Sequence, residues 1–481
     1  MATPKRRLLS SFALSALSIA AYGNQFTGDE IFKIVAYWSA DDRYTVSCPP
    51  EALKKGPFQV RLTPEGSFWL WNYNKARGLG KVAPTTDAGA QNSEQVAWER
   101  WIDAKVAYDR FLAAVDADAL NEEFLNTELP DDFKAASDPG PIPEGLRRLA
   151  GDAPRFASAV QPKLHTVTFD DGMSLALTDN VAMRPRYAYY RFSDGVMSGG
   201  QSVRKMPAAD LDALFKRAGI TASEQRVMKA VSLLEGGFDS INTYDTGFVS
   251  VGFIQFACLS AGSGSLGQVL KAQKERDAAA FDRDFRAFGL DVTPSGSLVA
   301  VDPATGEETV GPVAAQTIIR DKRLIAVFQR AGRISTPFRV AQLRVAKERY
   351  YPADDMVTVN LGGSPTRCRV SEIVRSEAGM ATLMDRKVNT GKLDPLPQVL
   401  ANVVYQNGLG SPREAASFEY QVVSALRWRK DYLDDDSLSQ PRFIVSQPVS
   451  RSGQRPKAKP PVAPVVKPKE TKKAPVKKRG S

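Results

Sequence analysis

From about residue 205 to residue 435 the sequence shows helical periodicity with explicit start and stop signals, and this feature limits the fold most. Residues 207–218 fit a short helix that Gly219 would close. Residues 221–224, Thr-Ala-Ser-Glu, form a capping box, which predicts a second helix running to Leu234. We therefore predict a mainly α-helical domain over 205–435.

The preceding part of the chain has mixed character. Residues 58–62 and 68–71 are strand-like, 98–115 carry the apolar spacing of a long helix, and 163–200 alternate like a small β unit. Residues 127–162 are rich in Pro, Asp and Gly and predict a linker or long loop. We expect an α+β protein divided into a smaller α/β region over 24–150, a linker and small β unit over 151–204, the helical domain over 205–435 and a tail over 440–481. A chain of 481 residues is too long for one ordinary core.

The N-terminus has the three-part pattern of a secretory signal over residues 1–23. Basic residues at 5–7 precede an apolar stretch over 8–21, and Ala21 and Gly23 are small residues before a cleavage point. The stretch is too short for a comfortable membrane span. We expect a secreted, periplasmic or cell-envelope protein with no membrane span after cleavage. The alternative is an amphipathic or disordered N-terminus of a cytosolic protein.

The formal net charge of +10 is concentrated at the C-terminus. Residues 455–481 contain ten Lys or Arg residues against the single acid Glu470, so the body is almost neutral. Interspersed prolines predict a disordered tail, which is either a solvated terminus or an adhesive segment for a polyanion such as an anionic envelope polymer, an anionic lipid or nucleic acid. The nearly neutral body disfavours a nucleic-acid partner. The tail would serve as a nucleic-acid arm only if the protein is cytosolic.

Histidine and cysteine usage excludes several classes of site. His165 is the only histidine, in a strand-like context where we expect it to be half-exposed, so multi-histidine zinc sites and Ser-His-Asp triads lose their candidates. We expect no metal and no cofactor. Cys48, Cys258 and Cys368 allow either one disulfide with a free thiol or three thiols. Catalysis by Asp and Glu carboxyl groups is therefore the chemistry for which candidates remain.

Glu235 is the strongest candidate for such chemistry. It lies in the run Leu-Leu-Glu-Gly-Gly-Phe-Asp over 233–239, on the last apolar turn of a predicted helix. Apolar neighbours disfavour the ionised form and raise the pKa, as a general acid requires near neutral pH. The two glycines leave room for a polymer, although a plain helix terminus explains them equally well.

A loop carrying a second acid follows. The stretch 243–256 contains Asp245 and Ser250 before a tight alternating segment, which can hold both side chains opposite Glu235. Glycoside hydrolysis uses one carboxylic acid to protonate the leaving oxygen and one carboxylate for water or for the developing positive charge of the sugar. We predict Asp245 in the second role and Ser250 as the group that orients water.

The pattern Glu-Gly-Gly-Phe-Asp at 235–239, followed by Gly-Phe-Ile-Gln-Phe at 252–256, resembles the catalytic region of the lysozyme superfamily, which includes goose-type lysozymes, lytic transglycosylases and family 46 chitosanases. The chitosanases are most similar. A later Asp-x-x-Val-x-x-Gly at 385–391 also resembles that family. The resemblance implies a lysozyme-like domain with Asp245 as general base and Ser250 in the place of a water-holding threonine. The interval of ten residues between the acids is shorter than is typical of chitosanases.

Further residues are assigned around this pair. We expect substrate contacts from Tyr244, Gly247, Gly252, Gln255 and Glu377.

The remaining acids and glycines have structural explanations. Asp239 is expected to cap a turn, and Asp385 to be a buried helix acid paired with Arg386 or Arg375. The glycine-rich residues 262–267 lack the Lys-Ser/Thr of a phosphate loop and predict a flexible loop.

The predicted function is cleavage of a β-1,4-linked amino-sugar polymer, by a glycoside hydrolase or a lytic transglycosylase. Peptidoglycan is preferred to chitosan because chitosan is a polycation, and a chain with a neutral body and a basic tail suits an anionic envelope. The alternative is a non-catalytic lysozyme-like module that binds glycan or serves as an envelope scaffold.

Overall fold

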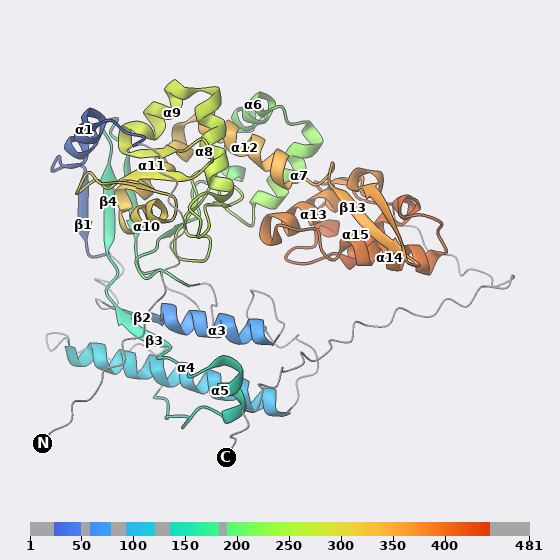
Figure 1. The fold of residues 1–481 in the computed structure, drawn as a ribbon, viewed down its shortest axis with the longest axis horizontal. Helices are drawn as coiled ribbons and strands as arrows, with labels where there is room; N and C mark the ends of the chain where they lie inside the picture. Colours follow the sequence, from blue (N-terminus) through green and yellow to red (C-terminus); the bar gives the residue numbers. More distant parts are fainter. Residues whose placement is uncertain (1–23, 50–57, 78–92, 121–134, 182–189, 443–481) are drawn as a thin grey trace, which may run out of the picture.

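In the computed structural model, the described residues are 24–49, 58–77, 93–120, 135–181 and 190–442, and they form two hydrophobic cores of very different size (Figure 1). Helices and small antiparallel sheets are mixed throughout, so the α+β class is confirmed. The smaller core lies between 62 and 156, and the larger one spans 26 to 438.

The smaller core is built from three helices and one strand pair. They are α3 (Pro64–Ala76), α4 (Ser93–Leu120), α5 (Glu144–Ala150), β2 (Gln59–Leu62) and β3 (Ala157–Val160). β2 pairs antiparallel with β3, and both contact α4. Trp69, Tyr73, Ile102 and Phe156 are buried at the centre. These residues form a compact unit in the lower part of Figure 1.

Two predictions for this unit are confirmed and two are wrong. The strand at 58–62 appears as β2, and the long helix appears as α4. Residues 68–71, predicted as a strand, belong to α3, because Thr63 accepts a hydrogen bond from the Gly66 N–H and Pro64 occupies the first helical turn. The described part of the predicted loop 127–162 contains α5 and β3.

The larger core begins with the N-terminal segment. It contains α1 (Gly28–Trp38), β1 (Tyr44–Ser47), β4 (Leu164–Thr168) and β5 (Ser174–Thr178). β4 lies between β1 and β5 in an antiparallel sheet that packs on α11 (Lys322–Ile334). Phe26 and Trp38 are buried in this core, so the predicted region 24–150 contributes to both cores.

Most of the helices follow residue 205. They are α6 (Ala208–Ala218), α7 (Ala222–Ser232), α8 (Gly264–Arg276), α9 (Ala278–Asp284), α10 (Pro312–Arg320), α11, α12 (Thr336–Tyr350), α13 (Glu377–Thr390), α14 (Leu396–Asn407) and α15 (Glu419–Ala425). Among the described residues, the strands of this part are β6 (Met197–Ser198), β7 (Ile241–Asn242), β8 (Ser250–Val251), β9 (Phe256–Ala257), β10 (Leu290–Val292), β11 (Leu298–Val301), β12 (Glu308–Val310), β13 (Met356–Leu361) and β14 (Ser364–Arg369). They form the sheets β6-β7-β8-β9, β10-β11-β12 and β13-β14.

The predicted helix signals are confirmed here. Gly219 closes α6 with a left-handed φ of 74°, and the capping box of Thr221 and Glu224 opens α7. α7 ends at Ser232, two residues before the predicted Leu234. Residues from Gly264 onward, predicted as part of a flexible loop, begin α8.

The histidine and the cysteines are also located. His165 lies on β4 as predicted but is buried rather than half-exposed, because it packs between Tyr44 and Asp179 and hydrogen-bonds to both. Cys48 is exposed, Cys258 and Cys368 are buried, and all three are free thiols.

The predicted signal over 1–23 and the tail from 443 onward lie outside the described residues. Within the described part of the chain, no helix is long and apolar enough to cross a bilayer.

Candidate active site around Glu235

Glu235 lies at a sharp change of chain direction directly after α7. The Glu235 N–H still bonds to the Ser232 carbonyl, as in a final helical turn. Gly236 then adopts a φ of 120°, and a side chain there would collide with Ser240. Gly237 donates to the Gly199 carbonyl. The two glycines are therefore required by backbone geometry at this turn.

Three side chains from distant parts of the sequence surround the Glu235 carboxyl group. Arg429 Nη1 lies 2.5 Å from Glu235 Oε1 and 3.4 Å from Asp385 Oδ1. Asn389 Nδ2 lies 3.5 Å from Glu235 Oε1 and also donates to Asp385. α13, which carries Asp385 and Asn389, packs directly on α7. Two carboxyl groups therefore face one guanidinium group.

The electrostatics of the cluster favour a bound proton. Burial raises the pKa of Glu235, the negative charge of Asp385 raises it further, and Arg429 opposes both. Burial likewise raises the pKa of Asp385. One guanidinium cannot balance two buried carboxylates, so the pair retains a proton to a higher pH than isolated acids do. The raised pKa predicted for Glu235 is confirmed.

Glu235 is the more accessible of the two acids. Its side chain is 12% exposed and that of Asp385 only 2%. Leu234 and Trp428, the chain neighbours of Glu235 and Arg429, are exposed apolar side chains. The Tyr432 hydroxyl is buried without a hydrogen-bond partner among the described residues. Burial raises the pKa of Tyr432, the charges of Asp385 and Glu235 add to the rise, and Arg429 opposes it. The site thus centres on a largely buried carboxyl group that keeps some access to solvent.

Asp245 and Ser250 form a second cluster in the turn between β7 and β8. Asp245 accepts hydrogen bonds from Asn242 Nδ2 at 2.9 Å and from the Gly247 N–H at 2.8 Å. A Cβ at Gly247 would crowd both Asp245 and Ser250 Oγ, so the glycine permits these two side chains to approach each other. The predicted base and the predicted water-orienting hydroxyl are therefore brought together.

The Glu235 and Asp245 clusters are attached to opposite ends of one short segment. A Cβ at Gly236 would collide with Ser240, and Asn242 donates to Asp245, so only Ile241 separates these two contact residues along the chain. The carboxyl groups are held by different partners: Arg429 and Asn389 for Glu235, Asn242 and Gly247 for Asp245.

The backbone near Asp245 has unusual geometry. Among the described residues, four non-glycine residues have positive φ, and Phe248, Gln255 and Leu259 are three of them. Such conformations are costly and are concentrated at functional sites in many proteins.

The other predicted substrate contacts mostly have internal roles. Tyr244 is buried and its carbonyl accepts bonds from Arg191 and Phe192. Gln255 donates to Ser240 Oγ, and Gly252 makes room for Gln342.

Glu377 is the first residue of α13 and is buried. Its carboxylate accepts two hydrogen bonds from Arg226 Nε and one from Nη2, as well as the Ser439 N–H. Burial opposes ionisation, but these bonds outweigh it and lower the pKa of Glu377 to about 2. This side chain joins α13 to α7.

The turn-capping role expected of Asp239 is wrong, and Asp385 is the buried helix acid that was predicted but has a different partner. Asp239 does not simply cap a turn: it is buried and accepts hydrogen bonds from the Gln201 N–H and from Arg333. Asp385 pairs with Arg429 and not with Arg386 or Arg375. Sequence reasoning missed Arg429 and Asn389 as parts of the site because they follow Glu235 by 194 and 154 residues. No local pattern marks Arg429, and Asn389 lies within the 385–391 motif but at a position to which the motif assigns no role.

A cavity of about 170 Å³ opens beside this region. It is lined by Leu233 at the end of α7, by Arg226 and Lys229, and by Asp435 and Ser437. Glu235 and Asp245 are not among its lining residues. In the described ranges, no three His, Cys, Asp or Glu side chains gather as a metal site.

Comparisons with protein-family models, with curated proteins and with solved structures find no match for this chain.

Proposed function

We propose that this protein is a glycosidase that cleaves a β-1,4-linked amino-sugar polymer, with Glu235 as the general acid. The observation that supports the proposal is the burial of the Glu235 carboxyl group close to that of Asp385. Burial raises the pKa of Glu235, the charge of Asp385 adds to the rise and Arg429 opposes it, while the carboxyl group stays partly exposed. A general acid needs both a retained proton and access to the leaving oxygen.

Glu235 would deliver its proton to the bridging oxygen between two sugars. Its carboxylate would then be stabilised by Arg429, which already lies 2.5 Å away, and by Asn389. Arg429 thereby assists the second half of the proton transfer, while Asp385 favours the protonated acid at the start. Asp385 is more deeply buried, so we assign it a positioning role rather than contact with substrate.

Asp245 and Ser250 would act on the other side of the sugar. Asp245 is held in place by Asn242 and the Gly247 N–H, which orient its carboxylate as water activation or cation stabilisation requires. Ser250, adjacent to it across Gly247, would position the water.

Charge distribution supports peptidoglycan as the substrate over chitosan. The net charge of +10 includes +9 from the tail, so the body offers no general attraction to a polycation such as chitosan. An anionic envelope polymer would be attracted to the tail.

A second candidate is a non-catalytic envelope protein that binds glycan. The 2.5 Å contact between Glu235 and Arg429 favours it, since a permanently ionised Glu235 could not donate a proton.

Digestion of purified peptidoglycan and of chitosan by the full chain, with the products weighed by mass spectrometry, separates the two candidates. The proposal predicts shortened glycans. Anhydro ends would identify a lytic transglycosylase, and reducing ends a hydrolase. Co-sedimentation with the polymer without any product would contradict the enzymatic proposal and support the binding protein.

A further inference from the structure

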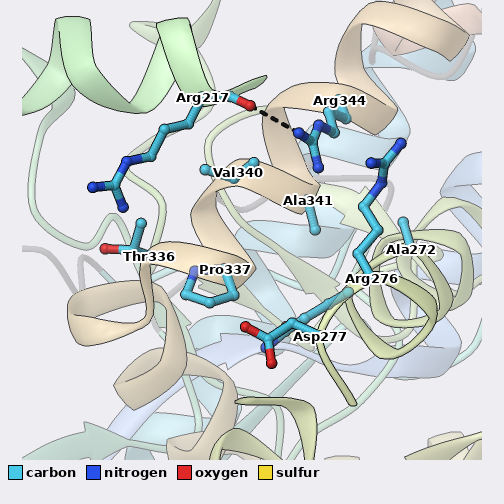
Figure 2. Close-up of a pocket in the computed structure, with 10 residues that line it drawn as sticks. Arg217, Ala272, Arg276, Asp277, Thr336, Pro337, Val340, Ala341 and Arg344 are labelled. Atoms are coloured by element: carbon cyan, nitrogen blue, oxygen red, sulfur yellow. Dashed lines mark hydrogen bonds between the residues drawn. The ribbon is translucent and has the colours of Figure 1, made fainter. Parts of the chain in front are cut away.

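A groove beside α12 is lined by three arginine side chains (Figure 2). It has a volume of about 290 Å³, near the lower end of small-ligand pockets, which run roughly from 300 to 1,000 Å³. Pro337, Val340 and Ala341 of α12 contribute its apolar surface. α12 packs against both α6 and α8, whose C-terminal ends provide the walls.

Three arginines from three helices line this groove. Arg217 lies in the last turn of α6, Arg276 is the last residue of α8, and Arg344 lies on α12, which packs against both helices. Arg344 donates to the Arg217 carbonyl at 2.8 Å, the dashed line in Figure 2. Figure 2 shows the Arg217 guanidinium on one side of the groove and those of Arg276 and Arg344 on the other.

These positive charges are not neutralised within the described part of the chain. The side chains of Arg217 and Arg276 form no ion pair or hydrogen bond with any described residue. The one acid in the groove wall, Asp277, forms no ion pair there, and its carboxylate accepts the Ala280 N–H at the start of α9. Burial lowers the pKa of Arg344, the positive charge of Arg276 lowers it further, and the negative charge of Glu348 only partly opposes them. Guanidinium groups gathered in this way repel one another, and an anion between them would remove the repulsion.

We propose that this groove binds a small soluble ligand through a diphosphate group. Guanidinium groups that approach from different helices match tetrahedral phosphate oxygens, which point in several directions, better than the two coplanar oxygens of one carboxylate. In this proposal one phosphate contacts Arg217 and the other contacts the Arg276–Arg344 pair. The apolar floor would accommodate the uncharged part of a larger ligand. The groove shares no residue with the Glu235 or Asp245 clusters, so this site is separate from the proposed active site.

The test is calorimetric titration of the full chain with inorganic pyrophosphate at physiological salt. The double variant R217Q/R276Q should bind pyrophosphate at least tenfold more weakly than the wild type, because charge-assisted hydrogen bonds are lost. A matched control, R100Q/R148Q, removes the same charge from two exposed arginines on α4 and α5. It should keep wild-type affinity, which separates the groove from general attraction to the basic tail.

A second variant tests the groove without changing any charge. Ala272→Met would fill the space beside Arg276 and should also weaken binding at least tenfold, and thermal melting checks that each variant is folded. Wild-type affinity in R217Q/R276Q or in Ala272→Met would overturn the proposal. So would the absence of saturable pyrophosphate binding by the wild type, or equal affinity for citrate, which carries comparable charge on carboxylates.

Discussion

Two carboxyl groups face one guanidinium group at the proposed active site, and burial together with these charges sets the pKa of Glu235. The sequence placed Glu235 on an apolar helix end and predicted a raised pKa from burial alone. In the structure, burial is the largest contribution, but Asp385 and Arg429 act in opposite directions on the same proton. Their balance allows an acid that is stabilised both before and after it gives up its proton.

Replacing Asp385 tests this balance. Asp385→Asn removes a negative charge that raises the pKa of Glu235, so that pKa should fall. Because the general acid works only while protonated, the alkaline limb of the pH–rate profile should move to lower pH, and activity at neutral pH should decrease roughly tenfold. The measurement is the pH dependence of kcat/KM.

The exposed Asp436 provides the control. Asp436→Asn should leave the profile unchanged. A normal profile in Asp385→Asn would show that Asp385 does not act on the proton of Glu235.

Residue-level prediction succeeded where a signal is local and failed where it is not. The approach of Asp245 to Ser250 follows from Gly247, which lies between them in the sequence. The partners of Glu235 come from α13 and from the segment after α15, and only tertiary packing brings them to α7. No spacing rule could identify Arg429 among the 64 Lys and Arg residues of the chain.

Among the secondary-structure elements, α7 and α13 determine the site because they carry Glu235 and Asp385. The ion pair between Arg226 on α7 and the buried Glu377 at the start of α13 fixes their relative position. Glu377 was predicted to contact substrate; its bonds to Arg226 and Ser439 indicate a structural role.

Breaking this pair should destabilise the fold in a pH-dependent way. Arg226→Gln leaves Glu377 buried with fewer partners, so we expect the free energy of unfolding to fall at pH 7, by less than for a fully buried pair because the Arg226 side chain is half-exposed. The folded-state pKa of Glu377 is lowered to about 2, so its ionised form stabilises the protein above its ordinary pKa, and this stabilisation is lost as pH falls toward 2. The difference between variant and wild type should therefore shrink from pH 5 to pH 2.

Denaturant unfolding across that pH range measures the effect. Arg204→Gln, at an exposed arginine near the same cavity, serves as the control and should change stability little. A difference that is independent of pH would contradict the role assigned to Glu377.

At the level of elements, helix ends were predictable and the identity of short apolar segments was not. The capping box of α7 and the glycine that closes α6 act through local hydrogen bonds, so they can be recognised from the sequence. Residues 68–71 are aromatic and strand-like, yet Thr63 and Pro64 start a helix that buries Trp69 against Phe156. Tertiary packing therefore determines the secondary structure of residues 68–71.

On the scale of the whole molecule, the chain folds around two cores, and the N-terminal residues 24–49 join the larger one. This could not be predicted from sequence, because the pairing of β1 with β4 spans residues 44 to 168. The boundary predicted at residue 150 falls within the smaller unit, before β3.

The two cores should unfold separately. Ile102→Ala removes a fully buried side chain of α4 from the smaller core and should cost about 2–5 kcal/mol there. Hydrogen exchange followed by mass spectrometry should show faster exchange in α3, α4 and α5, with α7 and α13 unchanged. Leu324→Ala in α11 should give the reverse pattern. Faster exchange throughout the chain in Ile102→Ala would show one cooperative unit.

The most direct test of the account is the activity of Glu235→Gln on the polymer that the wild type cleaves. The variant keeps the size and polarity of the side chain but cannot donate the proton, so we predict a decrease in kcat of at least roughly 100-fold, with polymer binding retained. Glu65→Gln, at an exposed position on α3, should behave as the wild type. Wild-type kcat in Glu235→Gln would contradict the assignment of Glu235 as the general acid.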